Sequence, residues 1–178
     1  MRNGRDAAEL QVATGLHPLY LASRPGYLYA RGSDRESCRR YAREMRSDGV
    51  RLAVVLLTAP EIRVFFDFDL CELYRSEGVE PLHYPIEDGL VPEELGTFHQ
   101  LVLIVEHRLA DASVLAHCNA GLGRTGLLAA GLLVRAGSSA ASAISRVRRV
   151  RSGALENRVQ EGFISEYHRE VSRQHGSR

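Results

Sequence analysis

His117-Cys-Asn-Ala-Gly-Leu-Gly-Arg-Thr-Gly126 is the stretch of the chain that decides its fold and its chemistry. It follows a short apolar segment typical of a strand, residues 113–117, and leads into residues 124–134, which are apolar on nearly all sides. A strand, a loop rich in glycine and a buried helix in this order are typical of an α/β domain. Because the N-terminus of such a helix presents backbone N–H groups, we expect residues 117–126 to bind an anion.

Cys118 stands at the start of this loop. A ring of inward N–H groups and the positive end of a helix dipole both favour the thiolate over the thiol. Gly121 and Gly123 permit the turns and close approach that side chains would block, and Arg124 can hold two phosphate oxygens at once. A thiolate beside such an arginine indicates attack on phosphorus. The alternative, a buried structural cysteine before a turn, does not require the Arg-Thr-Gly ending.

HCNAGLGRTG resembles the HCxxGxGR[ST]G form of the Cys-x5-Arg signature of cysteine-dependent protein tyrosine and dual-specificity phosphatases. The resemblance implies that Cys118 is the nucleophile and forms a phosphocysteine, and that Arg124 binds phosphate and stabilises the transition state. Thr125 would offer its hydroxyl to the departing sulfur, and His117 would hold the loop and support the thiolate. The phosphate-binding residues implied in this way are Asn119, Ala120, Gly121, Leu122, Gly123 and Arg124.

The chemistry also needs an acid for the departing oxygen. Tyr84-Pro-Ile-Glu-Asp-Gly-Leu-Val-Pro92 resembles the Pro-x-x-Asp-Gly-x-x-Pro loop of the dual-specificity branch. The resemblance makes Asp88 the general acid, which would later act as general base for the attacking water. Glu87 is the rival carboxylate, and a plain Asp-Gly turn is the structural alternative.

A third segment, Gly153-Ala-Leu-Glu-Asn-Arg-Val-Gln160-Glu-Gly-Phe, resembles the opening of the last helix in many of these phosphatases. The resemblance implies that Gln160 helps to place the hydrolytic water. An ordinary solvated helix residue is the alternative for this glutamine. Leu19–Gly26 resembles the opening strand of the same branch, so the likeness runs from about residue 18 to residue 170.

The 178 residues fit one domain, with 22 acidic and 23 basic side chains. The near balance of charge indicates no nucleic-acid partner and no membrane partner. All the basic residues are arginines, which excludes sites that need an amine, such as Walker-type loops and Schiff-base catalysts. We expect residues 1–16 to form a flexible N-terminal segment, residues 17–173 the catalytic domain, and residues 174–178 a flexible tail.

Strands and helices alternate along the chain, which predicts crossover connections between parallel strands. The expected fold is therefore a single α/β domain with a central, mostly parallel sheet flanked by helices, and the resemblance makes it the cysteine phosphatase fold. Residues 61–67 are left open, and Ser33 and Asp34 are candidate caps for the first helix. The expected strands are 18–22, 50–57, 79–84 and 113–117, and the expected helices are 33–46, 68–76, 93–109, 124–134, 140–150 and 157–171.

Cys38, Cys71 and Cys118 show no CxxC pair and no metal-ligand spacing, so we expect no metal and no cofactor. Sparse cysteines and the absence of a secretory signal indicate a cytoplasmic protein. Ordinary packing is expected for Cys38 and Cys71, although either could form a reversible disulfide with an oxidised Cys118. The arginine-rich stretch 146–151 is expected to be a solvated helix face rather than a site for acidic substrates.

The predicted function is that of a phosphomonoester hydrolase, a protein tyrosine or dual-specificity phosphatase acting on phosphorylated protein or peptide. Asn119 and Leu122 add no base to the loop, whereas related enzymes that act on inositol phospholipids often carry lysine there. Inositol phosphates or lipids remain a second candidate substrate class. A catalytically weak module that recognises phosphate and a sulfur transferase of the rhodanese type are the rival functions. The sequence indicates no oligomeric state.

Overall fold

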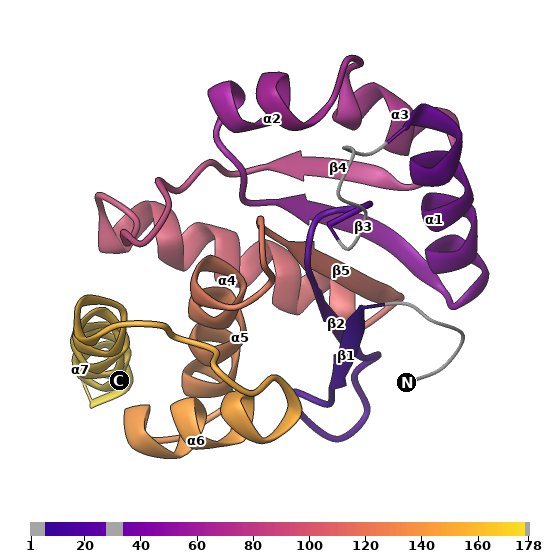
Figure 1. The fold of residues 1–178 in the computed structure, drawn as a ribbon. Coiled ribbons are helices and arrows are strands. Elements are labelled where there is room, and N and C mark those ends of the chain that lie inside the picture. Colours follow the sequence, from indigo (N-terminus) through magenta and orange to yellow (C-terminus); the bar gives the residue numbers. More distant parts are fainter. Residues whose placement is uncertain (1–5, 28–33, 177–178) are drawn as a thin grey trace.

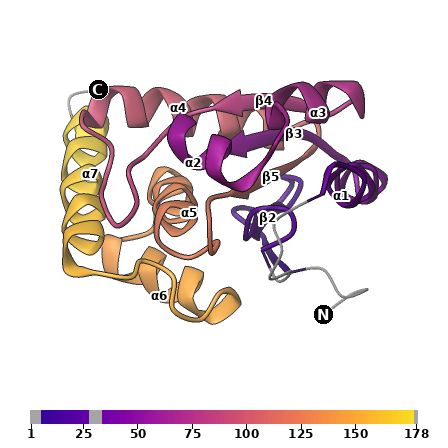
Figure 2. The same ribbon diagram turned by 45° about the horizontal axis from the view of Figure 1, so that its top comes forward.

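A five-stranded sheet runs through the molecule, with helices on both of its faces (Figures 1 and 2). The computed structural model describes residues 6–27 and 34–176. The β2–β5, β5–β3 and β3–β4 pairs are parallel, and β1 runs antiparallel to β2, so the sheet is mixed and mostly parallel, as predicted. In spatial order the strands are β1 (Ala7–Leu10), β2 (Leu19–Ala22), β5 (Ser113–His117), β3 (Val50–Val55) and β4 (Glu80–His83).

The strand β1 corrects the expectation that residues 1–16 form a loose end. Ala7–Leu10 pair with Leu19–Ala22 along the edge of the sheet, and the side chains of Leu10 and Val12 are buried. Four residues are too few to show an alternation of apolar and polar side chains. The strand forms because its backbone pairs with the free edge of β2. At the other end, α7 continues to Gly176, through part of the expected tail. Residues 1–5 and 177–178 of the two expected loose ends lie outside the described residues.

Two apolar clusters hold the helices against the two faces of the sheet. Helices α1 and α3 cover one face, while α4 and α5 cover the other and carry α6 and α7 on their outer side (Figure 2). The helices are α1 (Arg35–Ser47), α2 (Ala59–Phe65), α3 (Leu70–Ser76), α4 (Leu95–Leu109), α5 (Gly123–Arg135), α6 (Ala140–Val150) and α7 (Arg158–Gly176).

The first helix, α1, begins after Asp34, whose side chain accepts a hydrogen bond from the N–H of Ser37. Asp34 is thus the cap that the sequence predicted as one of two candidates, and the other, Ser33, lies outside the described residues. Such a side chain satisfies one of the backbone donors that a helix leaves unpaired at its start.

The short helix α2 occupies the interval that the sequence left open. Thr58 and Glu61 form a reciprocal capping box, and Pro60 lies in the first turn. None of the seven residues of α2 is buried. The helix therefore carries no apolar periodicity from which it could be predicted, and its caps are the local signal that fixes it.

The central helix α5 is buried along almost its entire length, from Gly123 to Val134. Its apolar side chains pack against β5, α4, α6 and α7, which surround the helix. Within the described ranges, no helix combines the length and the hydropathy needed to cross a bilayer. The position of α5 places its N-terminus at the carboxyl edge of the sheet, directly after β5.

Candidate active site

The carboxyl ends of three parallel strands meet where the predicted motif begins. Ala22 at the end of β2 and Val55 at the end of β3 both lie beside His117 at the end of β5. Ligands of parallel α/β sheets bind at this edge. We call residues 118–124, which follow β5, the anion loop, and residues 85–92, which follow β4, the acid loop (Figure 1).

Cys118 is buried at the base of the anion loop. The N–H of Gly121 donates a hydrogen bond to the Cys118 Sγ at 3.2 Å. Gly121 has φ +72°, and a Cβ there would lie 2.4 Å from the backbone of Ala22, so only glycine fits. A backbone donor aimed at sulfur stabilises negative charge on it.

The outer side of the anion loop is held by the segment that follows β2. The backbone N–H of Arg24 donates to the carbonyl of Asn119 at 3.0 Å, and its Nε donates to the Asn119 Oδ1 at 3.1 Å. The guanidinium also lies 4.2 Å from the centre of the Phe65 ring. Asn119 therefore braces the loop through its side chain, and no base stands at this position.

Arg124 at the end of the loop is almost fully buried and paired. Its Nη1 and Nη2 donate to the two carboxylate oxygens of Glu61 at 2.7 and 2.9 Å, and Nη1 also donates to the carbonyl of Ile86 at 3.0 Å. Asp88 Oδ1 lies 2.8 Å from Nη2. Burial disfavours the charge on Arg124, but the Glu61 hydrogen bonds and nearby negative groups outweigh it and raise the pKa.

The Nε of Arg124 is buried and has no hydrogen-bond partner within the described part of the chain. A buried donor of this kind costs free energy unless an acceptor binds to it. Glu61 thus holds one side of the guanidinium, while Nε on the other side has no acceptor among the described residues and the neighbouring Nη2 pairs with Asp88. An anion with two oxygens could accept from Nε and Nη2 together.

Asp88, the predicted acid, lies on the exposed side of the acid loop and pairs with Arg124. Its side chain is 71% exposed, so solvent reaches it while Arg124 remains buried. Glu87, the rival carboxylate, is also exposed but makes no ion pair with Arg124. The structure therefore brings Asp88, rather than Glu87, to the arginine of the anion loop.

The start of α7 holds the acid loop in place. Asn157 Nδ2 donates to the carbonyl of Gly89 at 2.9 Å, and Gln160 Nε2 donates to the carbonyl of Leu90 at 3.4 Å. Gln160 is fully buried, and its Oε1 accepts from the N–H of Glu156 at 2.8 Å. The predicted water-positioning residue therefore lies between the segment before α7 and the acid loop.

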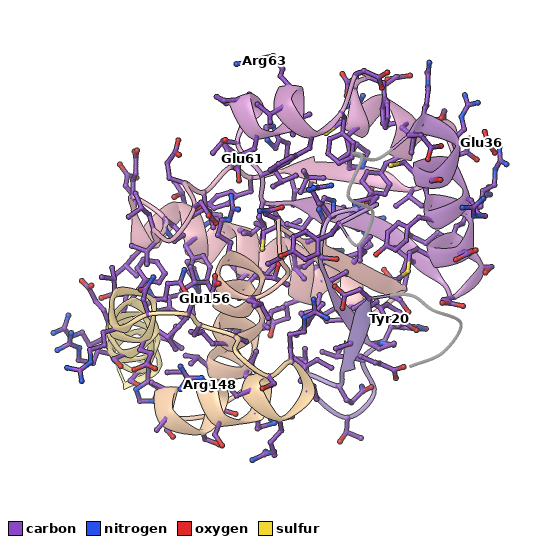
Figure 3. The ribbon with its side chains drawn as sticks, viewed as in Figure 1. Tyr20, Glu36, Glu61, Arg63, Arg148 and Glu156 are labelled. Atoms are coloured by element: carbon purple, nitrogen blue, oxygen red, sulfur yellow. The ribbon has the colours of Figure 1, made fainter. Side chains whose placement is uncertain are left out.

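Gly123 makes room for this neighbouring segment. A Cβ at position 123 would lie 2.3 Å from the Glu156 carboxylate and 2.7 Å from the Gln160 amide nitrogen. Leu155, just before them, has φ 54°, a conformation rare for a side chain of its size. Glu61 comes from α2, whereas Glu156 comes from the connection before α7 (Figure 3). Two distant parts of the chain therefore bring carboxylates to the anion loop.

The remaining two predicted residues, Thr125 and His117, are completely buried. The Thr125 hydroxyl has no partner among the described residues, and no hydrogen bond joins it to the Cys118 sulfur. Burial, with a smaller contribution from the charge of Arg124, lowers the pKa of His117 to about 4 against the opposing effect of the Cys118 backbone. The His117 ring, 5.8 Å from that of Tyr74, is therefore neutral at neutral pH and supports the loop without positive charge.

We expect His117 to make folding stability fall in acid. His117 takes up a proton near pH 6.5 in the unfolded chain but only near pH 4 in the folded chain. Its contribution to the free energy of unfolding is therefore present above pH 6.5 and is lost as the pH falls from 6.5 to about 4. The loss amounts to about 3 kcal/mol. Urea unfolding at neutral and acid pH will show that the free energy of unfolding depends less on pH in His117→Asn than in the wild type. His99 contributes equally to the wild type and to the variant. Identical pH dependence in the two would contradict this expectation.

Sequence reasoning missed Glu61, Asn157 and Glu156. Glu61 reaches Arg124 across 63 positions of the chain, and Asn157 reaches Gly89 across 68. Pairs at such separations leave no periodic pattern in one sequence. The local signal for Glu61 was its place three residues after Thr58, in a capping box.

All three cysteines are free in the structure. Cys38 is buried in the apolar cluster of α1 and α3, and Cys71 is half-buried against it, whereas Cys118 belongs to the cluster on the other face of the sheet. This placement agrees with the ordinary packing expected for Cys38 and Cys71.

The family model described as "Tc-R-P: Polymorphic toxin system, DSP-PTPase phosphatase" matches residues 33–138, more than half of the chain. The chain belongs to this family. The matched region includes both the anion loop and the acid loop. The resemblance to dual-specificity and tyrosine phosphatases, a class of hydrolases, is thereby confirmed.

Curated relatives support the same family. The protein tyrosine phosphatase PRL-1 of Leishmania major is 33% identical over 138 residues, which cover 72% of this chain and 74% of that protein. Cyclin-dependent kinase inhibitor 3 of Rattus norvegicus is 29% identical over 136 residues, which cover 75% of this chain. The match spans only 64% of the length of the latter protein.

Solved structures share the fold. A kinase associated phosphatase with its catalytic-site cysteine replaced by serine superposes with a TM-score of 0.82 at 24% identity, covering 97% of this chain and 98% of that one. The phosphatase Tk-PTP in its active form gives a TM-score of 0.73 at 26% identity, over 95% of this chain and 99% of that one. The predicted cysteine phosphatase fold is thereby confirmed.

Proposed function

We propose that this Tc-R-P protein hydrolyses phosphate esters of proteins or peptides in two steps, through a phosphocysteine at Cys118. The observation that carries the proposal is Arg124, a buried cation fixed by Glu61 on one side, with an unpaired Nε donor on another. The Gly121 N–H at the Cys118 sulfur and the Asp88 carboxylate at Arg124 supply the nucleophile's support and the acid. These are the parts that phosphoryl transfer to sulfur requires.

In the first step, the phosphate group accepts hydrogen bonds from the loop amides and from Nε and Nη2 of Arg124. Its oxygen takes the place of Asp88 at Nη2, which frees the Asp88 carboxyl to face the leaving group. The Cys118 thiolate forms a sulfur–phosphorus bond while the bond from phosphorus to the ester oxygen breaks. Asp88, protonated, transfers its proton to that oxygen, so the product leaves as a neutral alcohol or phenol.

In the second step, water attacks the phosphorus of the phosphocysteine. Asp88, now a carboxylate, takes a proton from this water, and the sulfur–phosphorus bond breaks to release inorganic phosphate. Sulfur leaves as thiolate, stabilised by the Gly121 N–H and aided by the Thr125 hydroxyl. Gln160, buried beside the anion loop, helps to place the water.

A phosphorylated protein or peptide is the proposed substrate. Neither Asn119 nor Leu122 adds a base to the anion loop, and the Asn119 side chain is occupied by Arg24. A multiply charged inositol phosphate would call for additional cations around its other phosphates. The relative named protein tyrosine phosphatase PRL-1 favours the same substrate class.

The test is to trap the intermediate. The full chain is mixed with a radiolabelled phosphotyrosyl peptide and quenched in acid within one turnover. We expect label on the peptide that contains Cys118, with an initial burst of product release. A panel of phosphoseryl peptides and inositol phosphates then ranks substrates by kcat/KM. Turnover without label on Cys118, or faster turnover of inositol phosphates, would overturn the corresponding part of the proposal.

Glu61 is expected to position Arg124 for this reaction. In Glu61→Gln the bidentate, charged hold on the guanidinium is lost, and we expect kcat/KM to fall about tenfold. Since Glu61 also caps α2, thermal unfolding of the variant must be measured alongside. Arg63→Gln on the exposed side of the same helix serves as the control. Unchanged kcat/KM in a folded Glu61→Gln chain would contradict this role.

A further inference from the structure

We propose that Asp6, before the first strand, supports the anion loop, because Asp6 holds Arg151 and Arg151 holds the peptide group whose N–H donates to the Cys118 sulfur. Asp6 immediately precedes β1, and Arg151 immediately follows α6, two elements that lie side by side (Figure 1). Neither residue touches the reacting atoms, so both are positioning residues. The inference rests on the proposed function, and it adds two residues outside the motif at 117–126 that position the anion loop.

Arg151 grips the anion loop from behind. Its Nη2 donates to the carbonyl of Ala120 at 2.9 Å, and its Nε donates to the carbonyl of Gly121 at 3.2 Å. The side chain is only 14% exposed, so these charge-assisted hydrogen bonds are shielded from solvent. Two consecutive carbonyls of the loop are thus held by one planar cation.

The planar peptide group between Ala120 and Gly121 connects Arg151 to the Cys118 sulfur. In a planar trans peptide the carbonyl and the following N–H point in opposite directions. The carbonyl of Ala120 points to Arg151, and the N–H of the same peptide group, which belongs to Gly121, points to the Cys118 Sγ at 3.2 Å. Arg151 therefore fixes and polarises the donor that stabilises the thiolate. The Gly121 carbonyl is held likewise, which turns the N–H of Leu122 away from Arg151.

Asp6 holds Arg151 in this position. Its two carboxylate oxygens pair with Nη1 and Nη2 of Arg151, the second at 2.8 Å. The hydrogen bonds from Arg151 outweigh partial burial and lower the pKa of Asp6, so the pair is charged at neutral pH. Removing Asp6 leaves a largely buried guanidinium without its counter-charge, held only by carbonyls. The link spans 145 residues, from one end of the chain to the back of the active site.

Arg151 departs from the expectation that stretch 146–151 is a solvated helix face, whereas Arg148 and Arg149 are exposed, as expected. Arg148 is also engaged, donating to the carbonyls of Ala154 and Leu155 at 3.0 and 2.9 Å. The side chain of Arg149, by contrast, donates to Ser145 at 3.4 Å on its own helix. The same helix therefore offers a control arginine that does not reach the anion loop.

The experiment compares Asp6→Asn, Arg151→Met and the double variant, all in the full chain. Glu9→Gln on β1 and Arg149→Met on α6 are the matched controls. Two quantities are measured, namely kcat/KM for p-nitrophenyl phosphate and the rate of alkylation of Cys118 by iodoacetamide. Peptide mapping by mass spectrometry separates Cys118 from Cys38 and Cys71. Alkylation is followed at about pH 6 and about pH 9, because only the thiolate reacts.

We expect Arg151→Met to lower kcat/KM about 30-fold and Asp6→Asn to lower it about fivefold, with the controls unchanged. The double variant should match Arg151→Met, because Asp6 acts through Arg151. Alkylation of Cys118 in Arg151→Met should slow about fivefold at the lower pH and stay within about twofold at the higher pH. A merely loosened structure would instead expose Cys118 and speed its alkylation at both values.

Additive losses in the double variant, or an Asp6→Asn chain as active as the wild type, would overturn the link. So would an unchanged ratio of the two alkylation rates in Arg151→Met. Alkylation requires no turnover, so its outcome is independent of the proposed hydrolysis. If the wild-type chain releases no phosphate, the proposed function fails while the alkylation ratio still decides on the role of Arg151.

Discussion

Cys118→Ser is expected to remove turnover of p-nitrophenyl phosphate, with kcat lowered by at least about 10⁴-fold. Serine keeps the shape of the side chain, but its hydroxyl does not ionise at neutral pH and is a far weaker nucleophile than a thiolate. The Gly121 N–H, which donates to sulfur at 3.2 Å, is arranged for a charged thiolate. Without that nucleophile no phosphocysteine forms. Steady-state release of p-nitrophenol measures the loss.

Binding should survive this substitution, because the phosphate is held by other groups. The substitution removes neither the loop amides nor Arg124, which Glu61 holds in the wild type. Isothermal titration with a non-hydrolysable phosphonate analogue of a phosphotyrosyl peptide is expected to give affinities for Cys118→Ser and the wild type that agree within about fivefold. Cys71→Ser on α3 is the control and keeps full activity. Substantial turnover by Cys118→Ser would remove the nucleophile from the proposed mechanism.

The parts of this molecule that the sequence predicts are those encoded within one continuous segment. The motif at 117–126 combines a strand end, two glycines and a helix start, and its chemistry follows from local backbone geometry. The uniformly apolar segment after it predicts the buried helix α5. Asp88 is predictable because its neighbours, Gly89 and two prolines, mark its loop.

The remaining parts depend on pairs of residues that are far apart in the chain. Glu61 meets Arg124 across 63 positions, and Asp6 meets Arg151 across 145. In the sequence each of these is one charged residue among many, and its partner is chosen by tertiary packing. Strand β1 is missed for the same reason, since its hydrogen bonds are made to β2 and its four residues carry little pattern of their own.

Asp88→Asn is expected to lower kcat by about 10²–10⁴-fold on esters with poor leaving groups, such as phosphoseryl peptides. An alkoxide needs a proton as it departs, and asparagine has none to give. p-Nitrophenolate leaves readily without one, so the loss of kcat/KM on p-nitrophenyl phosphate should be much smaller. Comparing kcat/KM on the two substrates isolates proton donation, because kcat/KM does not include the later attack of water in which Asp88 acts as base. Glu87→Gln, one residue earlier, is the control and should change neither value.

Because Asp88 pairs with Arg124, we also expect Asp88→Asn to bind inorganic phosphate more tightly than the wild type, although its kcat is lower. In the wild type the Asp88 carboxylate lies 2.8 Å from Nη2, where a phosphate oxygen would bind, so the two anions compete for one donor. Asparagine competes less well because it carries no charge. Inorganic phosphate should therefore inhibit Asp88→Asn about threefold more tightly than the wild type, although the variant is slower. If the acid were elsewhere, kcat on the phosphoseryl peptide would be unchanged and only the inhibition would shift.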